Sequence, residues 1–369
     1  MHSKKVIFSA LIASVLLAGC GNSNQSVESN EASNALHESA DEMLQEETGP
    51  VITEFPTSMT ELEKGLSVVS YEKGYLFDKF LESGASSDSD VMEFLIKNLP
   101  GLLSNAVFGS SPFGCSTISA SGTDGSRYFG RNFDWNTCEA LIVHTTPEGG
   151  YESVSTVNMD FVGSVGRLPD AAKTLAAIYA PLDGMNEKGL CVSINMIQDN
   201  ASISQNTGKT GITTTTAVRL LLDYAADTVE ALELLRQYDL HASMGMMVHF
   251  AISDQEGNSV VVEYIDDEMV VTETPVVTNF YLSEGDKYGI GTKQSHDRYD
   301  LLMGLLEEKV SFTAEDVRDA LDAVSKDNFG GFESTEWSIV YNQTTGQVQY
   351  YHRENYEEGW TFALTGGRE

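Results

Sequence analysis

Short apolar runs separated by Gly, Asp and Asn fill most of the chain beyond residue 114. The runs are rich in Val, Ile, Thr and aromatic residues, and each has the length of a single strand, so we predict that they form β-strands. The predicted strands are 115–121, 126–133, 140–146, 152–159, 189–197, 247–254, 258–265, 268–273, 276–282, 335–342 and 347–353.

Longer segments with apolar residues at helical spacing lie between these runs. The predicted helices are 214–225, 228–237, 295–308 and 313–324. Two of them have capping signals at their N-termini, because Asp227 is followed three residues later by Glu230, and Thr313 by Asp316. Strands in runs with helices grouped between them favour an α+β layered domain over a regular βαβ array.

The pattern before residue 109 is that of amphipathic helices. The apolar residues at this spacing are Leu62, Leu66, Val69, Leu76, Phe77, Phe80, Leu81, Val91, Phe94, Leu95, Leu99, Leu102 and Leu103. We predict two or three helices here, with Pro100 as a break or kink. The turn-rich stretch 108–114 cannot continue a helix, so we predict a segment boundary at Gly114.

The first residues of the chain have the pattern of a secretory signal peptide, which we assign to 1–19. Lys4 and Lys5 precede an apolar run, 6–17, that is too short for a stable membrane span. The sequence Leu-Ala-Gly-Cys at 17–20 resembles a bacterial lipobox, which predicts lipidation of Cys20 and anchoring to a membrane of the bacterial cell envelope, on its extracytoplasmic side. An ordinary signal peptide with an incidental Cys is the alternative, and it would also export the protein.

Ser, Asn and Glu dominate the next segment, 20–59, which has few large apolar residues. Such a composition does not bury enough apolar surface to offset the entropy of the chain. We therefore predict a flexible acidic tether.

Composition excludes several classes of function. The 55 acidic residues outnumber the 22 Lys and Arg residues, and the net charge of −33 would repel phosphate backbones, so we expect no nucleic-acid partner. The four Cys residues form no CxxC pair, and the seven His residues form no HExxH pair. We therefore expect neither a metal site nor a disulfide framework, and no cofactor.

Three motifs follow one another around the first predicted strands. They are GCST at 114–117, GRNFDW at 130–135, and DGMNEKGL at 183–190, followed by Asn195. Together they resemble the linear amide carbon–nitrogen hydrolases, a group that includes choloylglycine hydrolase, penicillin V acylase, N-acylethanolamine acid amidase and acid ceramidase. Thr278-Asn279 and Arg298 resemble the downstream Asn and the second Arg of that family.

The resemblance implies an N-terminal-nucleophile hydrolase, with a four-layer αββα sandwich at 115–369 preceded by a helical prosegment at 60–114. It also implies autocatalytic cleavage after Gly114, which would expose Cys115 as a new N-terminus. The site residues implied by the motifs are Cys115, Arg131, Asp134, Asn195, Asn279 and Arg298.

The chemistry of these residue types fits acyl transfer through a thiol. A Cys thiol has a reference pKa near ~8.5 and needs a base, which the freed α-amino group of Cys115 can supply. Arg131 would stabilise the thiolate, and Asp134 would orient the amine. Asn195 and Asn279 would donate to the oxyanion of the tetrahedral intermediate. Arg298 would complete the polar wall.

Several interpretations of single residues stay open at this point. Arg131 and Asp134 could instead form a structural ion pair. Cys138 and Cys191 are interpreted as core thiols, and Asn186 with Gly189 as a turn. The remaining large side chains near the motifs either line an acyl pocket or pack in the core: Phe133, Trp135, Met185 and Met196.

The predicted activity is cysteine-dependent hydrolysis of a linear amide in an N-acyl amide. The short separation of Asn279 and Arg298, and the segment before Cys115, resemble the amidase and ceramidase branch of that family more than the bile salt hydrolases. This resemblance implies lipid-like substrates such as fatty acid amides. Acyl transfer to an amine, bile salt or penicillin V hydrolysis, and a non-catalytic binding lipoprotein are the alternatives.

Overall fold

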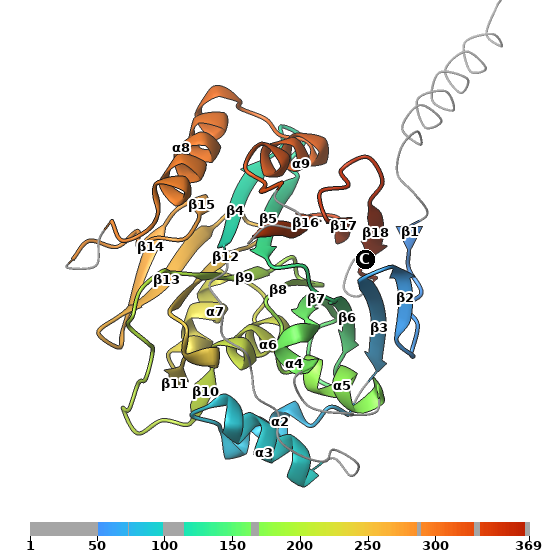
Figure 1. Cartoon of the computed structure of the whole chain (residues 1–369), viewed down its shortest axis with the longest axis vertical. Coiled ribbons are helices and arrows are strands. Elements are labelled where there is room, and N and C mark those ends of the chain that lie inside the picture. Colours follow the sequence, from blue (N-terminus) through green and yellow to red (C-terminus); the bar gives the residue numbers. More distant parts are fainter. Residues whose placement is uncertain are drawn as a thin grey trace, which may run out of the picture. The chain divides into compact units, whose positions relative to one another are not determined.

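Two large sheets dominate the chain in the computed structural model, which describes residues 51–72, 74–98, 114–163, 170–285, 289–327 and 333–365 (Figure 1). The seven-stranded sheet has the order β1 (Val51–Ile52), β18 (Trp360–Ala363), β17 (Gln347–His352), β16 (Ser334–Asn342), β5 (Arg127–Trp135), β4 (Gly114–Ser121), β15 (Val276–Val277). The nine-stranded sheet has the order β14 (Glu268–Glu273), β13 (Ser259–Ile265), β12 (Val248–Ser253), β9 (Cys191–Met196), β8 (Asp183–Asn186), β7 (Ser153–Asn158), β6 (Ala140–Thr146), β3 (Leu66–Glu72), β2 (Thr60–Glu63).

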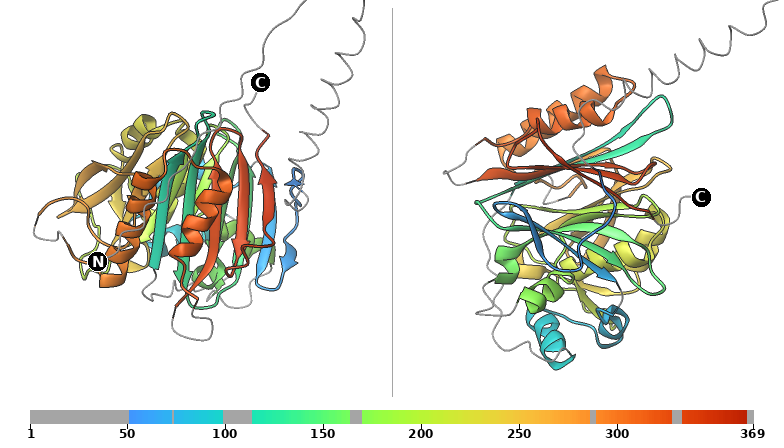
Figure 2. Two further views of the ribbon diagram at one scale, coloured as in Figure 1. Left: turned by 90° about the horizontal axis from the view of Figure 1, so that it is seen from above. Right: turned by 90° about the vertical axis from the view of Figure 1, so that its right-hand side faces the viewer.

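Helices cover the outer faces of both sheets (Figure 2). On the seven-stranded sheet they are α8 (Lys293–Glu308) and α9 (Ala314–Ala323). On the side of the nine-stranded sheet lie α2 (Phe77–Ser83), α3 (Asp88–Asn98), α4 (Met159–Gly163), α5 (Asp170–Ala177), α6 (Thr214–Tyr224) and α7 (Thr228–Leu235). A short parallel pair, β10 (Gly211–Thr213) and β11 (Asp239–His241), and a 3-10 turn, Ser243–Gly245, complete the elements. The predicted four-layer αββα sandwich is confirmed.

Close packing fixes α9 on its sheet. A Cβ atom at Gly130 of β5 would lie 2.7 Å from Cγ1 of Val317 and 2.9 Å from Cγ2 of Ile118. Only glycine therefore leaves room for the helix at this point. The face of β4 and β5 that carries Gly130 and Ile118 is thus the outer face, toward α8 and α9.

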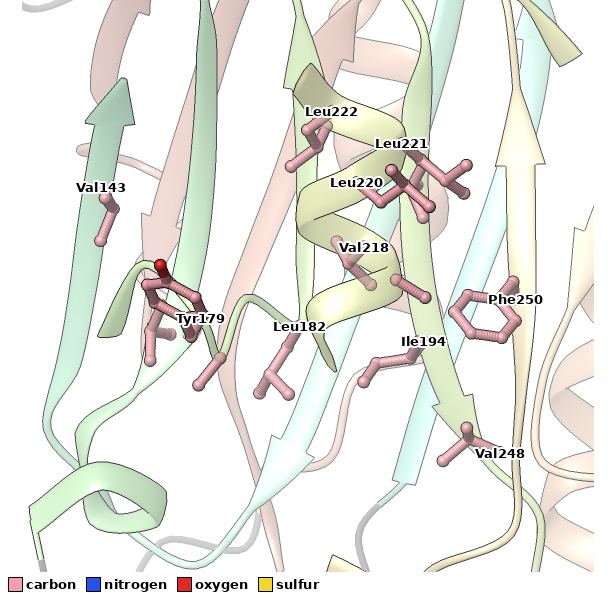
Figure 3. Close-up of a cluster of buried hydrophobic side chains, with 14 of the residues drawn as sticks. Val143, Tyr179, Leu182, Ile194, Val218, Leu220, Leu221, Leu222, Val248 and Phe250 are labelled. Carbon is pink, nitrogen blue, oxygen red and sulfur yellow. The ribbon is translucent and has the colours of Figure 1, made fainter. Parts of the chain in front are cut away.

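The nine-stranded sheet buries α6 against its outer face (Figure 3). Residues Thr214 to Asp223 are all buried, and the two charged residues among them, Arg219 and Asp223, form a buried ion pair with 2.7 Å between Nη2 and Oδ1. Thr213 caps the helix by accepting the backbone N–H of Thr216, and the hydroxyl of Thr216 accepts the N–H of Thr213. Labelled in Figure 3 are Val143, Tyr179, Leu182, Ile194, Val218, Leu220, Leu221, Leu222, Val248 and Phe250.

Most predicted elements agree with the structure. The strands 140–146 and 268–273 have the predicted bounds, and Asp227 and Thr313 cap their helices as predicted. Gly189 adopts a positive φ of 77° in the turn that follows Asn186, also as predicted.

Three regions differ from the sequence prediction. The predicted strand 276–282 is a strand only over Val276–Val277, and the rest is a loop. Strand β8 was not predicted, because its sequence, Asp-Gly-Met-Asn, has turn composition. In the segment 60–72, which was predicted as helix, the chain instead forms β2 and β3.

The error in 60–72 has a tertiary cause. Strand β3 pairs in parallel with β6 from Leu66 opposite Ala140 to Glu72 opposite Thr146. Backbone pairing with a strand about 70 residues away outweighs the helical spacing of Leu62, Leu66 and Val69. The remainder of the predicted helical segment is helical at α2 and α3, and 99–113 lie outside the described residues.

The predicted tether is also shorter at its C-terminal end than expected. Strand β1 pairs with β18, and the Phe55 ring stacks on His144 with 3.9 Å between ring centroids. The segment 51–59 therefore packs on the domain. The predicted signal peptide, the lipidation site Cys20 and the rest of the tether lie outside the described residues.

Candidate active site

Cys115 lies near the start of β4 and faces the nine-stranded sheet. Its backbone N–H donates to Oδ1 of Asn279 at 2.9 Å, and its Sγ lies 3.9 Å from the carbonyl oxygen of Ile194 in β9. The residue is fully buried. Burial raises the pKa of its thiol above the ordinary value, against the opposing charge of Arg131. In the uncut chain, therefore, the thiol is protonated and inaccessible.

Arg131 lies on the same face of the sheet as Cys115. Residue Thr117, two positions after Cys115, is directly opposite Arg131 in β5, so the two side chains point the same way. The Arg131 guanidinium donates from Nη1 to Oδ1 of Asn195 at 3.1 Å and from Nη2 to the carbonyl of Ile194 at 3.3 Å. It therefore reaches the same backbone carbonyl as the thiol.

Asp183 of β8 is the acidic partner of Arg131. Its Oδ2 lies 2.6 Å from Nε of Arg131, and both side chains are fully buried. Trp337 and Tyr341 also donate to this carboxylate, each at 3.1 Å. Burial alone would lower the pKa of Arg131, but Cys115 when it is ionised, and the carboxylate of Asp183, raise it, so the guanidinium stays charged.

Asp134 lies on the opposite, outer face of β5. Its Oδ2 pairs with Nη1 of Arg298 in α8 at 2.7 Å and with Nζ of Lys326 at 3.4 Å, and its Oδ1 accepts the hydroxyl of Thr335 at 2.7 Å. Burial alone would raise the pKa of Asp134, but the charges of Arg298 and Lys326 outweigh burial and lower that pKa. Arg298 also donates to the Ser116 hydroxyl at 3.0 Å.

These contacts exclude the alternative that Arg131 and Asp134 form an ion pair. Residues three apart in a strand point to opposite faces, and each of the two has a different partner. Asp134 is directly opposite Gly114, so its carboxylate lies where cleavage after Gly114 would create a new α-amino group.

Asn195 and Asn279 differ in whether their side-chain N–H donors have partners. Oδ1 of Asn195 accepts from Arg131 and from Ser193, while its Nδ2 is buried and has no partner among the described residues. Nδ2 of Asn279 donates to the carbonyl of Met196 at 2.8 Å. The side-chain amide of Asn195 therefore has a buried donor without a partner, close to Cys115. An oxyanion in the site would require such a donor.

The structure thus brings all six predicted site residues together: Cys115, Arg131, Asp134, Asn195, Asn279 and Arg298. Sequence reasoning missed Asp183, Lys326 and Thr335 as members of the cluster. Asp183 had a signal, since it opens the DGMNEKGL motif, but only Asn186 and Gly189 of that motif were given a role, in a turn. Lys326 and Thr335 carry no motif that could have indicated them.

The large side chains near the site pack as core residues. Phe133 and Met185 are fully buried, and Phe133 stacks on Trp337 with 4.0 Å between ring centroids. Cys138 and Cys191 are buried free thiols, in agreement with their interpretation as core residues. Two surface pockets, of about 920 and 390 Å³, do not include Cys115.

The described ranges contain neither a metal-binding cluster nor a membrane-spanning helix. There, no group of three or more His, Cys, Asp or Glu residues could hold a metal ion. No helix in the same ranges is long and apolar enough to cross a membrane.

Comparison with known proteins finds one similar family. Residues 115–281 match the linear amide C-N hydrolases of the choloylglycine hydrolase family, and the match begins at Cys115. The match indicates an amide hydrolase that acts on linear amides. No curated protein sequence matches the chain.

Solved structures of similar fold include other amide hydrolases. A Cys-to-Ala mutant of the conjugated bile acid hydrolase from Clostridium perfringens is 18% identical, with a TM-score of 0.53 over 69% of this chain and 93% of that one. An Arg-to-Leu variant of the same enzyme is 16% identical, with a TM-score of 0.50 over 69% and 98%. The penicillin V acylase from Agrobacterium tumefaciens is 18% identical, with a TM-score of 0.46 over 64% and 83%.

Proposed function

We propose that the chain matures by cleavage after Gly114 and then hydrolyses an N-acyl amide through an acyl-enzyme on Cys115. One observation carries this proposal. The backbone nitrogen of Cys115, which would become the free α-amine, is held by Asn279 and lies beside Asp134, while the thiol of the same residue lies beside Arg131. A base and a nucleophile would thus arise together from one cleavage.

The catalytic cycle follows from this arrangement. The α-amine takes the thiol proton, Sγ attacks the amide carbon, and the amine passes the proton to the leaving nitrogen as the C–N bond breaks. Water, deprotonated by the same amine, then attacks the thioester and releases the acid and the thiol. Nδ2 of Asn195 would donate to the oxyanion in both steps, and loss of such a donor costs about 100- to 1000-fold in rate.

The two faces of β5 carry opposite charges, and we propose a different role for each charge. On the inner face, Arg131 is charged and would stabilise the thiolate that forms when the α-amine takes the proton. On the outer face, Asp134 is ionised and would orient the new ammonium or amine. Asp183 keeps Arg131 in place, and Arg298 keeps Asp134 in place.

As the substrate we propose a lipid-like N-acyl amide, such as a fatty acid amide. The short separation of Asn279 and Arg298 supports this class. Bile salts and penicillin V are the alternatives, because the similar structures include a conjugated bile acid hydrolase and a penicillin V acylase. Transfer of the acyl group to an amine would use the same site.

We also propose that the protein is exported and anchored through a lipid on Cys20. The lipobox-like sequence at 17–20 supports this location. A substrate with a long acyl chain would partition into the same membrane surface.

Maturation is tested on the purified full-length protein by intact mass spectrometry and N-terminal sequencing. We expect a heavy fragment that begins at Cys115, and an uncut Cys115→Ala variant that hydrolyses none of a series of fluorogenic N-acyl aminocoumarins. Cys138→Ala, which removes a buried thiol outside the site, is the matched control and should be cut and active. Activity in a chain that stays uncut would refute the free-amine mechanism.

The substrate class is tested with the same series by varying the acyl length from two to sixteen carbons. Turnover that rises with acyl length supports the lipid-like class. Faster hydrolysis of a taurine-conjugated bile acid or of penicillin V would assign the chain to one of the alternatives.

A further inference from the structure

Asn279 lies in a loop, although its side chain holds the backbone nitrogen of Cys115. Strand β15 ends at Val277, and the chain from 278 to 283 has neither helix nor strand conformation. No ladder of backbone hydrogen bonds fixes Asn279, so its position depends on whatever holds this loop. The loop 278–283 is called the Asn279 loop below.

His249 holds the N-terminal end of the Asn279 loop. The residue is fully buried in β12 and lies directly opposite Asn195 of β9. Its Nε2 lies 2.8 Å from the carbonyl oxygen of Thr278, the residue before Asn279. One imidazole is thus adjacent to both candidate oxyanion donors.

Glu263 of β13 holds the C-terminal end of the same loop. Its carboxylate accepts the backbone N–H groups of Leu282 and Ser283, both at 2.8 Å, and the Ser283 hydroxyl at 2.5 Å. Oε1 of Glu263 also lies 3.0 Å from Nδ1 of His249, so the two residues that hold the loop contact each other.

Glu263 is an ionised carboxylate in this network. The Thr278 carbonyl only accepts, so Nε2 of His249 donates to it. Burial alone would raise the pKa of Glu263, but its interactions with His249, with the Ser283 hydroxyl and with the backbone N–H of Leu282 lower it to about 2. The loop is therefore held by a ring N–H donor at one end and by a carboxylate at the other.

We propose that His249 and Glu263 are positioning residues of the active site, which fix both ends of the Asn279 loop and so set Asn279 against Cys115. This inference rests on the proposed function, because it takes Asn279 as part of the catalytic machinery.

The reaction rate would depend on the exact position of Asn279. A loop of six residues that carries a catalytic group needs its ends held within a fraction of an ångström, and a displacement of about 1 Å can cost about 100-fold in rate. Charge-assisted hydrogen bonds are shorter and stronger than neutral ones, so a buried His–Glu pair holds the loop more firmly than an amide would.

The test compares conservative variants of the full-length, self-cleaved protein. His249→Gln keeps a donor for the Thr278 carbonyl but removes the ring nitrogen that contacts Glu263, and Glu263→Gln keeps the shape but replaces an acceptor by a donor. We expect kcat for a fluorogenic N-acyl aminocoumarin to fall about 100-fold in each, with KM changed less than about threefold. Ser283→Ala, a milder change, should lower kcat severalfold.

His144 provides the matched control. It is also a buried histidine paired with a glutamate, Glu152, at 2.8 Å, but it contacts none of the site residues in the described structure. His144→Gln should leave kcat and KM within about twofold of the parent. If His144→Gln lowers kcat as much as His249→Gln does, the effect is one of general stability and the proposal is wrong.

A double-mutant cycle separates positioning from structure. If His249 acts through Asn279, His249→Gln should have no further effect on kcat in an Asn279→Ala background. Additive losses would overturn the proposal, and so would a folded His249→Gln, Glu263→Gln or Ser283→Ala protein with unchanged kcat. If Asn279→Ala itself leaves kcat unchanged, the assigned role of Asn279 fails instead, which distinguishes the two failures.

Discussion

Cys115 and Asp134 point to opposite faces of adjacent strands, and this arrangement separates their roles. The thiol faces Arg131 between the sheets, whereas the carboxylate faces Arg298 beneath α8. The backbone nitrogen of Cys115 belongs to the peptide bond after Gly114, the residue directly opposite Asp134. Cleavage of the preceding peptide bond would convert that nitrogen from an amide into an amine, and so would connect the two faces chemically.

Gly114 is expected to be essential for this cleavage. A Cβ atom at this position would lie 2.5 Å from Nζ of Lys326, 2.5 Å from Oε1 of Glu333 and 2.8 Å from Oδ2 of Asp134. Gly114→Ala would therefore displace the Lys326–Glu333 ion pair or Asp134, and we predict that self-cleavage slows at least about 100-fold. The measurement is the cleaved fraction against time on a denaturing gel.

Two further variants test the steric explanation of that prediction. Gly304→Ala in α8, where the added Cβ would meet no described atom within 4 Å outside the local helix backbone, should be cleaved at the parental rate. Glu333→Ala should partly restore cleavage to Gly114→Ala, because it creates space beside the methyl group. A Gly114→Ala protein that matures normally would contradict the prediction.

The pH dependence of self-cleavage follows from the burial of Cys115. Attack on the preceding carbonyl requires the thiolate. Burial raises the pKa of this thiol, so the fraction of thiolate continues to increase at pH values where an ordinary thiol is already ionised. Asp134 stays ionised throughout, because its pKa is lowered. We predict that the cleavage rate of the unprocessed chain rises about tenfold per pH unit between pH 6 and 8. A rate that is flat or falls over this range would be inconsistent with attack by the buried thiolate.

At the scale of elements, the segment before Cys115 is part of the sheet rather than a detachable cover. Strand β3 extends the nine-stranded sheet along the whole of β6, and β1 extends the other sheet. Helices α2 and α3 bury Phe80 and Leu95 completely. Tyr75 donates to the buried carboxylate of Asp223 at 2.8 Å. These contacts do not depend on the bond between Gly114 and Cys115.

We therefore predict that the two fragments stay associated after cleavage. Size-exclusion chromatography under native conditions should give one species, and a denaturing gel should separate it into two. Deletion of 60–109 should yield insoluble protein, because it removes two strands and leaves their apolar partners exposed. Fragments that separate without denaturant would show that the N-terminal segment is a removable prosegment.

At the scale of the whole molecule, the four layers close the site in the uncut chain. Cys115 is fully buried, and both sheets contribute to its surroundings, β4 and β5 from one and β8 and β9 from the other. If the fragments stay associated, the predicted lipid on Cys20 would anchor both of them. The predicted anchor would lie on the light fragment, so it would keep the heavy fragment and its active site at the membrane.

The sequence alone determined the regular strands, the helix caps and the residue types of the site. Alternating and β-branched runs fold much as predicted, as in 140–146 and 268–273, because their patterns are local. The family motifs named all six site residues, because an acyl-transfer site requires a nucleophile and oxyanion donors at fixed positions along the chain. Their catalytic roles stay predictions.

Only the tertiary structure decided which of these residues contact one another. Arg131 pairs with Asp183 rather than Asp134, because the pleat of β5 sends the two side chains to opposite faces and only the packing of two sheets supplies the partner. Strand β3 forms because β6 is available to pair with it. His249 and Glu263 carry no sequence signal, since their contacts with the Asn279 loop join strands and loop that are distant along the chain and meet only in the folded protein.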